Sequence, residues 1–179
     1  MKLELFSVPL FIGNVDLKKI KLDATMGEAW VSKTPSSFNK RNIIDPESEQ
    51  YLLSVIAELL KENYQNFSVC FVDIWRNKYV DNDFQEPHIH AGPKSKFSFI
   101  LYEKFDLNPH TIFFNPAKHL ISATMGDNHF GILQTFTPSV KAGQIIVFPA
   151  YVEHMVNRNS DQVTISGNLD FKFIEMEKK

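Results

Sequence analysis

Hydrophobic and polar residues alternate almost without interruption from Gln162 to Phe173. Successive side chains of a β-strand point to opposite faces, so a period of two predicts one long strand with an apolar face and a polar face. The polar face either meets bulk water or lines a wet cavity, and the pattern alone leaves both interpretations open. The apolar set is Val163, Ile165, Leu169, Phe171 and Phe173, and the polar set is Gln162, Thr164, Ser166, Asn168, Asp170 and Lys172.

A helical period stands earlier in the chain, from about Pro46 to Tyr64. Asp45 is a good N-cap, and a proline at the first helical position is compatible with helix initiation. Acidic residues in the first turn favour the positive end of the helix dipole. The apolar stripe consists of Leu52, Leu53, Ile56, Leu59 and Leu60.

After this helix, short β-prone segments alternate with turn residues, which predicts a mainly β sandwich or barrel. The turns are expected at Asn115-Pro116, Met125 to Asn128 and Asn157 to Asp161. With no repeat and no linker in 179 residues, we expect one domain covering 1–179. The expected strands are Phe67 to Trp75, Phe97 to Tyr102, Thr111 to Phe114, Ile132 to Thr137, Gln144 to Phe148 and Gln162 to Phe173.

The composition indicates the cellular compartment of the protein and the kinds of partner that it binds. The net charge of −2 comes from 19 basic and 21 acidic residues without long runs of one sign, which predicts neither nucleic acid nor membrane as a partner. Neither a signal peptide nor a membrane span is expected. Cys70 cannot form an internal disulfide and is expected to be a small buried hydrophobe, which fits a cytoplasmic protein. A homodimer is one option for the assembly.

Histidines supply the candidate chemistry. His88 and His90 are separated by one residue, so on an extended segment both imidazoles point to the same side, as a metal site requires. A third ligand from a distant strand would complete a facial set, and His154 is the candidate. Such a pair is weak evidence alone, because ordinary surface histidines explain most of them. The remaining histidines, His110, His119 and His129, have no partner at metal spacing, although His129 could reach the mouth of a site.

A series of motifs in fixed order resembles one known family, the 2-oxoglutarate- and iron(II)-dependent oxygenases of the type common in phages and marine bacteria. The resemblance spans nearly the whole chain, although each motif is short. The motifs are Leu5 to Leu10, Trp75-Arg76-Asn77, Pro87 to His90, Ser98 to Tyr102, Phe114-Asn115-Pro116, Gly143 to Pro149, His154 and Ile165 to Asn168.

This resemblance implies a double-stranded β-helix, or jelly roll, with one or more helices packed on one side and a metal in the mouth of the barrel. His88, His90 and His154 fall on the positions that hold iron(II) and are the expected catalytic residues. His90 stands where related oxygenases have an aspartate. Three neutral imidazoles leave the full +2 charge of the metal, which should strengthen the binding of an anionic co-substrate.

The resemblance also implies a co-substrate pocket for 2-oxoglutarate. The family usually carries a basic residue about eight positions beyond the distal histidine, and Gln162 stands there. An amide brings no charge, so Arg158, Arg76, Lys96 or Lys172 would have to replace the guanidinium fork that matches a carboxylate. The expected polar lining is Tyr102, Gln162, Thr164, Ser166 and Asn168, which favours the cavity interpretation of the last strand.

Aromatic residues are assigned mainly to packing. Trp75 and Asn77 share one strand face and are secondary site candidates, because a buried aromatic beside a hydrogen-bonded amide explains them equally well. The aromatics expected in the core are Phe97, Phe99, Phe113, Phe114, Phe148 and Tyr151.

Three functions remain open at this point. The first is an oxygenase that decarboxylates 2-oxoglutarate to succinate while hydroxylating an unknown substrate. The second, motivated by Gln162, is a cupin-like three-histidine metalloenzyme, a dioxygenase or a hydrolytic enzyme, that does not use 2-oxoglutarate. The third is a jelly roll that has lost catalysis and serves as a binding or structural module.

Overall fold

The computed structural model describes residues 7–90, 92–105, 111–125 and 134–174. Strands dominate these ranges, as the sequence predicts. The elements are β1 (Phe11–Asn14), the 3-10 helix η1 (Leu17–Lys19), β2 (Leu22–Ala24), β3 (Gly27–Glu28), β4 (Pro35–Ser36), β5 (Asn42–Ile44), α1 (Pro46–Leu60), β6 (Phe67–Tyr79), β7 (Asp83–His88), β8 (Phe97–Lys104), β9 (Thr111–Phe114), α2 (Lys118–Met125), β10 (Thr135–Phe136), β11 (Gln144–Pro149), β12 (His154–Asn159) and β13 (Gln162–Phe173).

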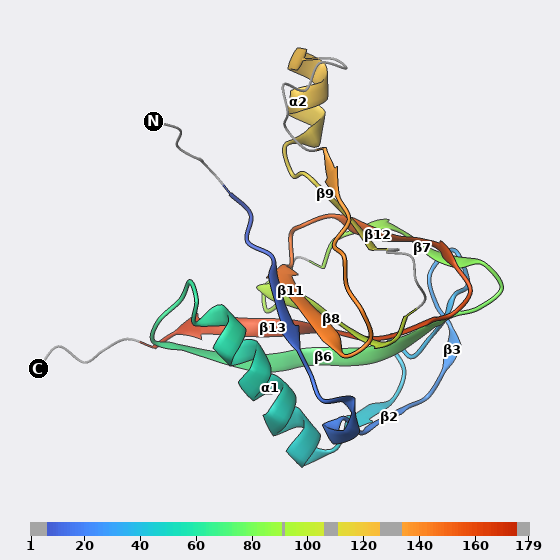
Figure 1. Cartoon of the computed structure of the whole chain (residues 1–179), viewed down its shortest axis with the longest axis vertical. Coiled ribbons are helices and arrows are strands. Elements are labelled where there is room, and N and C mark those ends of the chain that lie inside the picture. Colours follow the sequence, from blue (N-terminus) through green and yellow to red (C-terminus); the bar gives the residue numbers. More distant parts are fainter. Residues whose placement is uncertain (1–6, 91, 106–110, 126–133, 175–179) are drawn as a thin grey trace, which may run out of the picture.

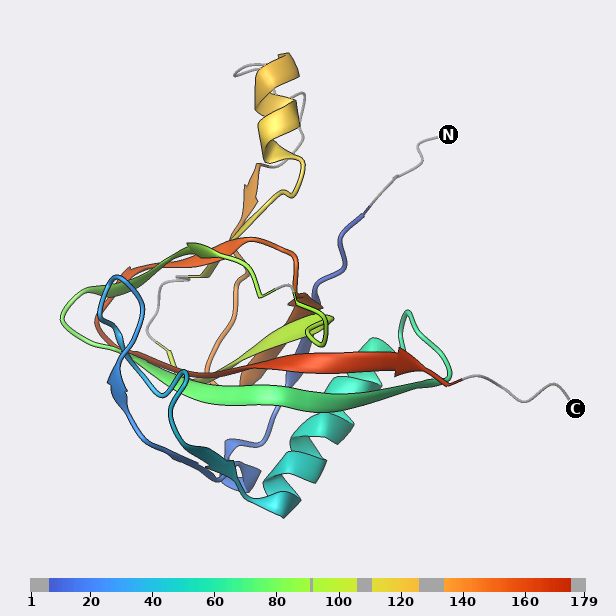
Figure 2. The same ribbon diagram turned by 180° about the vertical axis from the view of Figure 1, so that it is seen from behind.

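Two antiparallel sheets face each other (Figures 1 and 2). The larger sheet has the order β1-β11-β8-β13-β6-β4-β3, and the smaller has the order β10-β9-β12-β7. Strands β2 and β5 form a separate pair. Neighbours in space are far apart in sequence, as when β13 lies between β8 and β6. This is the predicted jelly-roll architecture, a double-stranded β-helix.

Helix α1 crosses the outer face of the larger sheet (Figure 1). The side chain of Asp45 accepts a hydrogen bond from the backbone N–H of Ser48 at 3.2 Å, which confirms the predicted N-cap. Leu52, Ile56 and Leu60 are fully buried against the sheet. The helix ends at Leu60, earlier than predicted, because the following residues form a turn that leads into β6.

Strand β13 is buried on both faces over most of its length. Ile165 and Leu169 belong to the core cluster under α1. The polar residues of the opposite face are also buried, with Gln162 at 0% and Thr164 at 2% exposure. The polar face therefore looks into the space between the two sheets, and the cavity interpretation is correct. Lys172 lies beyond the cover of the smaller sheet and is exposed.

Cys70 lies on a part of the larger sheet that the smaller sheet does not cover. It is exposed, so its expected burial is wrong. Strand β6 continues to Tyr79, four residues beyond its predicted end, and alternates along its first part. Val69 and Phe71 pack against the core cluster under α1, which turns the thiol of Cys70 to the opposite, uncovered face.

The aromatic core is largely as predicted. Phe97, Phe99, Phe113 and Phe148 are buried, and Phe113 packs edge-on against Phe148 at 4.9 Å between ring centroids. Tyr151 is 53% exposed and does not belong to the core, because it lies in the turn between β11 and β12.

Several elements do not follow from the local pattern. Asn157 to Asn159 complete strand β12, so the predicted turn is reduced to Ser160 and Asp161. Strand β7 contains Pro87 and lies at the edge of the smaller sheet, where a missing N–H is tolerated. Of the strand expected over 132–137, Thr135–Phe136 is present, while 132 and 133 lie outside the described residues. The turn expected over 125–128 lies outside them beyond Met125.

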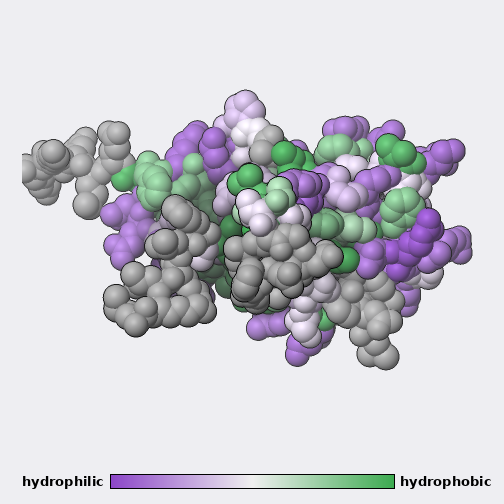
Figure 3. All heavy atoms as spheres, turned by 90° about the horizontal axis from the view of Figure 1, so that it is seen from above, coloured by the Kyte–Doolittle hydropathy of each residue, from purple (hydrophilic) through white to green (hydrophobic). Residues whose placement is uncertain are grey.

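Helix α2 stands away from the two sheets (Figure 1). Seen from above, hydrophilic and hydrophobic side chains are mixed over the surface (Figure 3). Leu120 of α2 is 72% exposed. Among the described residues, neither α1 nor α2 has the length and apolar character that a membrane crossing requires.

Candidate metal centre

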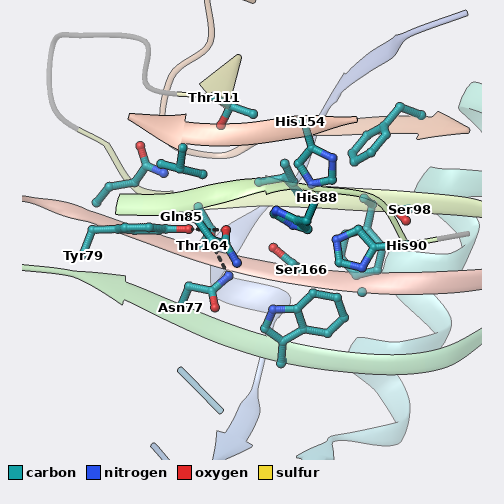
Figure 4. A pocket seen from close by; sticks show the side chains of 17 residues that line it. Asn77, Tyr79, Gln85, His88, His90, Ser98, Thr111, His154, Thr164 and Ser166 are labelled. Atoms are coloured by element: carbon teal, nitrogen blue, oxygen red, sulfur yellow. Dashed lines mark hydrogen bonds between the residues drawn. The ribbon is translucent and has the colours of Figure 1, made fainter. Parts of the chain in front are cut away.

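Three imidazoles converge between the sheets, at the edge formed by β7 and β12. His88 ends β7 and lies directly opposite His154, the first residue of β12. His90 follows two residues after β7, where its backbone N–H donates to the carbonyl of Ala150 at 2.9 Å. The ring centroids are 4.3 Å apart for His88 and His154, 4.9 Å for His88 and His90, and 5.2 Å for His90 and His154. Figure 4 shows the three rings turned toward a common space.

The donor set fits a divalent metal. One ring nitrogen from each histidine lies within 4.8 Å of the other two. The Nδ1 of His88 is 2.6 Å from the carbonyl oxygen of Glu86, and the Nδ1 of His154 is 3.1 Å from that of Val152. In the neutral tautomer that donates from Nδ1, the Nε2 lone pair is left free for a metal. Two backbone carbonyls thus prepare two of the three ligands.

Burial keeps these histidines neutral. It lowers the pKa of His90 to about 3, and the neighbouring His88 adds to the effect. Burial likewise lowers the pKa of His154 well below its usual value. The electrostatic effects of His88 and His90 lower it further. For His88 burial again lowers the pKa, although the carbonyl and carboxylate of Glu86 oppose the shift. Neutral imidazole is the form that ligates a metal, so the site is prepared for binding at pH 7.

These shifts make the metal-free protein sensitive to acid. A histidine of the unfolded chain takes up a proton below about pH 6.5, whereas the buried histidine does not. The free energy of unfolding is therefore highest above that pH and falls as the pH drops toward 3. Each buried histidine contributes a slope of up to about 1.4 kcal/mol per pH unit. We expect urea unfolding in the presence of a chelator to give a lower free energy of unfolding at pH 5 than at pH 7. His90→Gln should reduce this slope, and an equal slope in both proteins would contradict the assignment.

A cavity extends from the histidines along the pair β6 and β13. The register places Ser166 opposite Trp75 near the histidines, then Thr164 opposite Asn77, then Gln162 opposite Tyr79. The four-residue step from Ser166 to Gln162 corresponds to about 14 Å of strand. In Figure 4, Tyr79 and Gln85 lie at the opposite end from His90 and Ser98.

Several polar side chains of the walls have hydrogen-bond partners. The hydroxyl of Tyr79 donates to Oε1 of Gln85 at 2.9 Å. Asn77 accepts from the hydroxyl of Ser36 at 2.6 Å and donates to Thr164 at 3.4 Å. Burial raises the pKa of Tyr79 far above that of a free tyrosine, so its hydroxyl stays protonated and uncharged.

Two buried side chains of the cavity contain polar atoms that have no hydrogen-bond partner. Neither amide atom of Gln162 makes a hydrogen bond, although the residue is fully buried. The indole N–H of Trp75 is also unpaired, and the residue is 2% exposed. Leaving a buried polar group unpaired costs about 1–3 kcal/mol. Both side chains line the cavity, so a ligand or water placed there would satisfy them.

The predicted lining residues divide into two groups. Gln162, Thr164 and Ser166 line the cavity. Tyr102 and Asn168 do not line it but support residues that do. Tyr102 shares a hydrogen bond of 2.8 Å with Thr111, and Asn168 accepts one of 2.8 Å from Ser98.

The structure does not bring any of the four candidate basic residues into the cavity. Arg76 forms a two-pronged ion pair with Glu103 at 2.6 and 2.8 Å, and it donates to the carbonyl of Leu22 on the outer side of the sheet. Arg158 is exposed and lies over the ring of Phe84. The other two are exposed as well, with partners at Pro93 for Lys96 and at Asp170 for Lys172.

Other parts of the site were not expected from the sequence. A register irregularity between β7 and β12 turns Gln85 inward although it stands three residues before His88. Thr111 and Tyr79 also line the cavity without having been expected there. The secondary candidates Trp75 and Asn77, which the sequence did suggest, line it as well. The only sequence signal for the unexpected lining residues is that they are polar residues within β-prone segments, and this signal is weak by itself.

A pair of stacked aromatic side chains that does not line the cavity has one member close to the ring of His88. Trp30 stacks on Phe38 at 4.7 Å and lies 5.5 Å from the ring of His88. Of the other histidines, His119 is exposed on α2, while His110 and His129 lie outside the described residues.

The family becomes clear from comparison with known proteins. Residues 73–168, more than half of the chain and including all three histidines, match the model of a family described as "Putative 2OG-Fe(II) oxygenase". The chain belongs to this family. Its members are oxygenases that use iron(II) and 2-oxoglutarate, and the three-histidine cluster fits iron binding.

Solved structures of low sequence identity share the fold of this oxygenase. An oxidoreductase of the 2OG-Fe(II) oxygenase family from Burkholderia pseudomallei is 12% identical with a TM-score of 0.52, and the match covers 88% of this chain and 71% of that one. The non-heme alpha-ketoglutarate-dependent epimerase SnoN from nogalamycin biosynthesis is 10% identical with a TM-score of 0.54, over 83% of this chain and 66% of that one. No curated protein sequence matches the chain.

Proposed function

We propose that this oxygenase holds iron(II) on His88, His90 and His154 and binds 2-oxoglutarate in the adjoining cavity in order to hydroxylate a substrate. One observation carries the proposal. The three imidazoles converge at one end of a cavity that contains unpaired hydrogen-bonding groups, and the chain belongs to a family that uses these two cofactors. The identity of the substrate is not part of the proposal.

The chemistry divides between the cofactors and the chain. When bound, iron(II) supplies the activation of dioxygen, coupled to the oxidative decarboxylation of 2-oxoglutarate to succinate and carbon dioxide. The chain supplies three neutral ligands, two of which are oriented by the carbonyls of Glu86 and Val152. It also buries His154 at 3% exposure, which would keep bulk water away from this ligand when a metal is bound.

The polar wall of β13 positions the co-substrate. Thr164 and Ser166 lie between the histidines and Gln162, so their hydroxyls face the space that an elongated 2-oxo acid would occupy. The unpaired N–H of Trp75, opposite Ser166, is available as a donor near the metal end. These groups carry no charge and therefore orient the ligand by hydrogen bonds alone.

The proposal predicts conversion of 2-oxoglutarate to succinate by purified protein supplied with iron(II), ascorbate and oxygen, with a rate that rises when a true substrate is present. Proton NMR of the reaction mixture measures both compounds. If neither binding of 2-oxoglutarate nor formation of succinate is found, including with candidate substrates, the proposed function is wrong. Oxygen consumption that does not change when 2-oxoglutarate is omitted would favour a three-histidine metalloenzyme without this co-substrate.

The setting of the enzyme is proposed from the sequence. We expect one catalytic domain over 1–179, a cytoplasmic location, and an affiliation with the phage and marine bacterial branch of the family. The small net charge favours a small molecule or a side chain as substrate over nucleic acid. Separation of cell fractions and light scattering of the purified protein test the location and the proposed option of a homodimer.

A further inference from the structure

The far end of the cavity, opposite the histidines, is built from uncharged polar groups of separate strands. Gln162 comes from β13, Tyr79 from β6, Gln85 from β7 and Thr111 from β9. Gln162 is 0% exposed, and neither its amide nitrogen nor its amide oxygen has a hydrogen-bond partner. A ligand or an ordered water at this end of the cavity would satisfy an amide that is buried to this degree.

Among the described residues, no cationic side chain lines this end of the cavity. The lining residues, all of which belong to the described ranges, include no lysine and no arginine. The candidate basic residues Arg76, Arg158, Lys96 and Lys172 are exposed or paired elsewhere, as with Arg76 and Glu103. The internal segments outside the described residues, 91, 106–110 and 126–133, contain neither lysine nor arginine in their sequence.

The positive charge of the site is therefore concentrated at the metal end. Three neutral imidazoles leave a divalent ion with its full charge of +2. A site with one carboxylate ligand and one far-end arginine would carry the same total, since the added negative and positive charges cancel. 2-Oxoglutarate is a dianion, so either arrangement balances it. The arrangement in this chain leaves only hydrogen bonds for the remote carboxylate.

We propose that Gln162 recognises the remote carboxylate of the 2-oxo acid through an uncharged amide hydrogen bond, while the third imidazole compensates for the missing cation at the metal. The inference rests on the proposed function and makes Gln162 the residue that sets co-substrate selectivity. A hydrogen bond from a neutral donor to a charged group contributes less than a two-pronged pair with arginine. The site therefore discriminates only modestly between 2-oxoglutarate and a 2-oxo acid without a remote carboxylate.

The ratio of two dissociation constants measures this selectivity. Isothermal titration calorimetry of the manganese(II)-loaded protein would compare 2-oxoglutarate with 2-oxovalerate, which has the same chain length and no remote carboxylate. For the wild type we expect 2-oxovalerate to bind about tenfold more weakly, as one hydrogen bond to a charged group implies. Gln162→Met, which removes the donor at similar volume, should bring the ratio close to one. Gln162→Arg should raise it by a further factor of ten or more.

The outcomes separate the inference from the function on which it rests. Manganese(II) affinity serves as the control for folding and should be unchanged in both variants, because Gln162 lies at the end of the cavity away from the histidines. If the wild type binds 2-oxoglutarate but Gln162→Met leaves the ratio unchanged, the inference is overturned and the proposed function stands. If the metal-loaded wild type binds neither acid, the proposed function itself fails.

Discussion

His154→Ala is expected to reduce the affinity of the protein for iron(II) or manganese(II) by more than about 100-fold, because even the loss of a group that only supports a ligand costs 10- to 100-fold. His154 lies directly opposite His88, and its ring approaches those of both other histidines. Two imidazoles alone would leave the metal without its third protein ligand. Calorimetric titration and elemental analysis of the purified variant measure the loss, and formation of succinate should disappear with it.

His119→Ala is the matched control. His119 is exposed on α2, so the same change of residue type should leave metal affinity as in the wild type. Circular dichroism should show the same strand content in both variants. Metal binding by His154→Ala at wild-type affinity would rule out the proposed ligand set, and equal losses in both variants would point to a nonspecific effect.

Gly167→Ala is expected to lower the free energy of unfolding by about 1–3 kcal/mol, in the upper part of that range. A Cβ atom at this position would lie 2.6 Å from the backbone oxygen of Asp73 and 2.6 Å from the ring of Phe99. The oxygen belongs to the paired strand β6, and the ring is 1% exposed, so neither can move aside easily. The melting temperature should fall by about 2–4 °C for each kcal/mol.

Gly92→Ala provides the comparison for this prediction. The nearest atoms to its added Cβ would be at 3.8 and 4.0 Å, which is ordinary van der Waals contact. We expect a change in the free energy of unfolding within about 0.5 kcal/mol, as for other surface substitutions. Chemical denaturation of both variants tests the pair, and equal stability of the two would show that the close approach of β13 to β6 is not a constraint.

The parts of the fold that were predicted correctly are those with a strong local signal. The bounds of β13 follow from its period of two, and the start of α1 follows from Asp45 and Pro46. The convergence of His88 and His90 follows from their spacing on extended chain. In each case the deciding interactions lie within a few residues of one another, so the sequence contains the information directly.

The parts that were missed depend on contacts between distant segments. Gln85 faces the cavity because of a register irregularity between β7 and β12, which no pattern within β7 reveals. Strand β12 contains Asn157 and Asn159, which favour turns locally, but pairing with β9 and β7 holds the segment extended. Arg76 was a candidate anchor for the co-substrate, but the strand order β8-β13-β6 within the larger sheet places it beside Glu103.

The central claim is that 2-oxoglutarate binds next to a metal held by three histidines, and calorimetric titration of 2-oxoglutarate into metal-free and manganese(II)-loaded wild-type protein tests it most directly. The positive charge of the site comes from the metal, so we expect binding to the loaded protein and at least tenfold weaker binding to the metal-free protein. Equal affinity in the two forms, or no binding to the loaded protein, would contradict the claim.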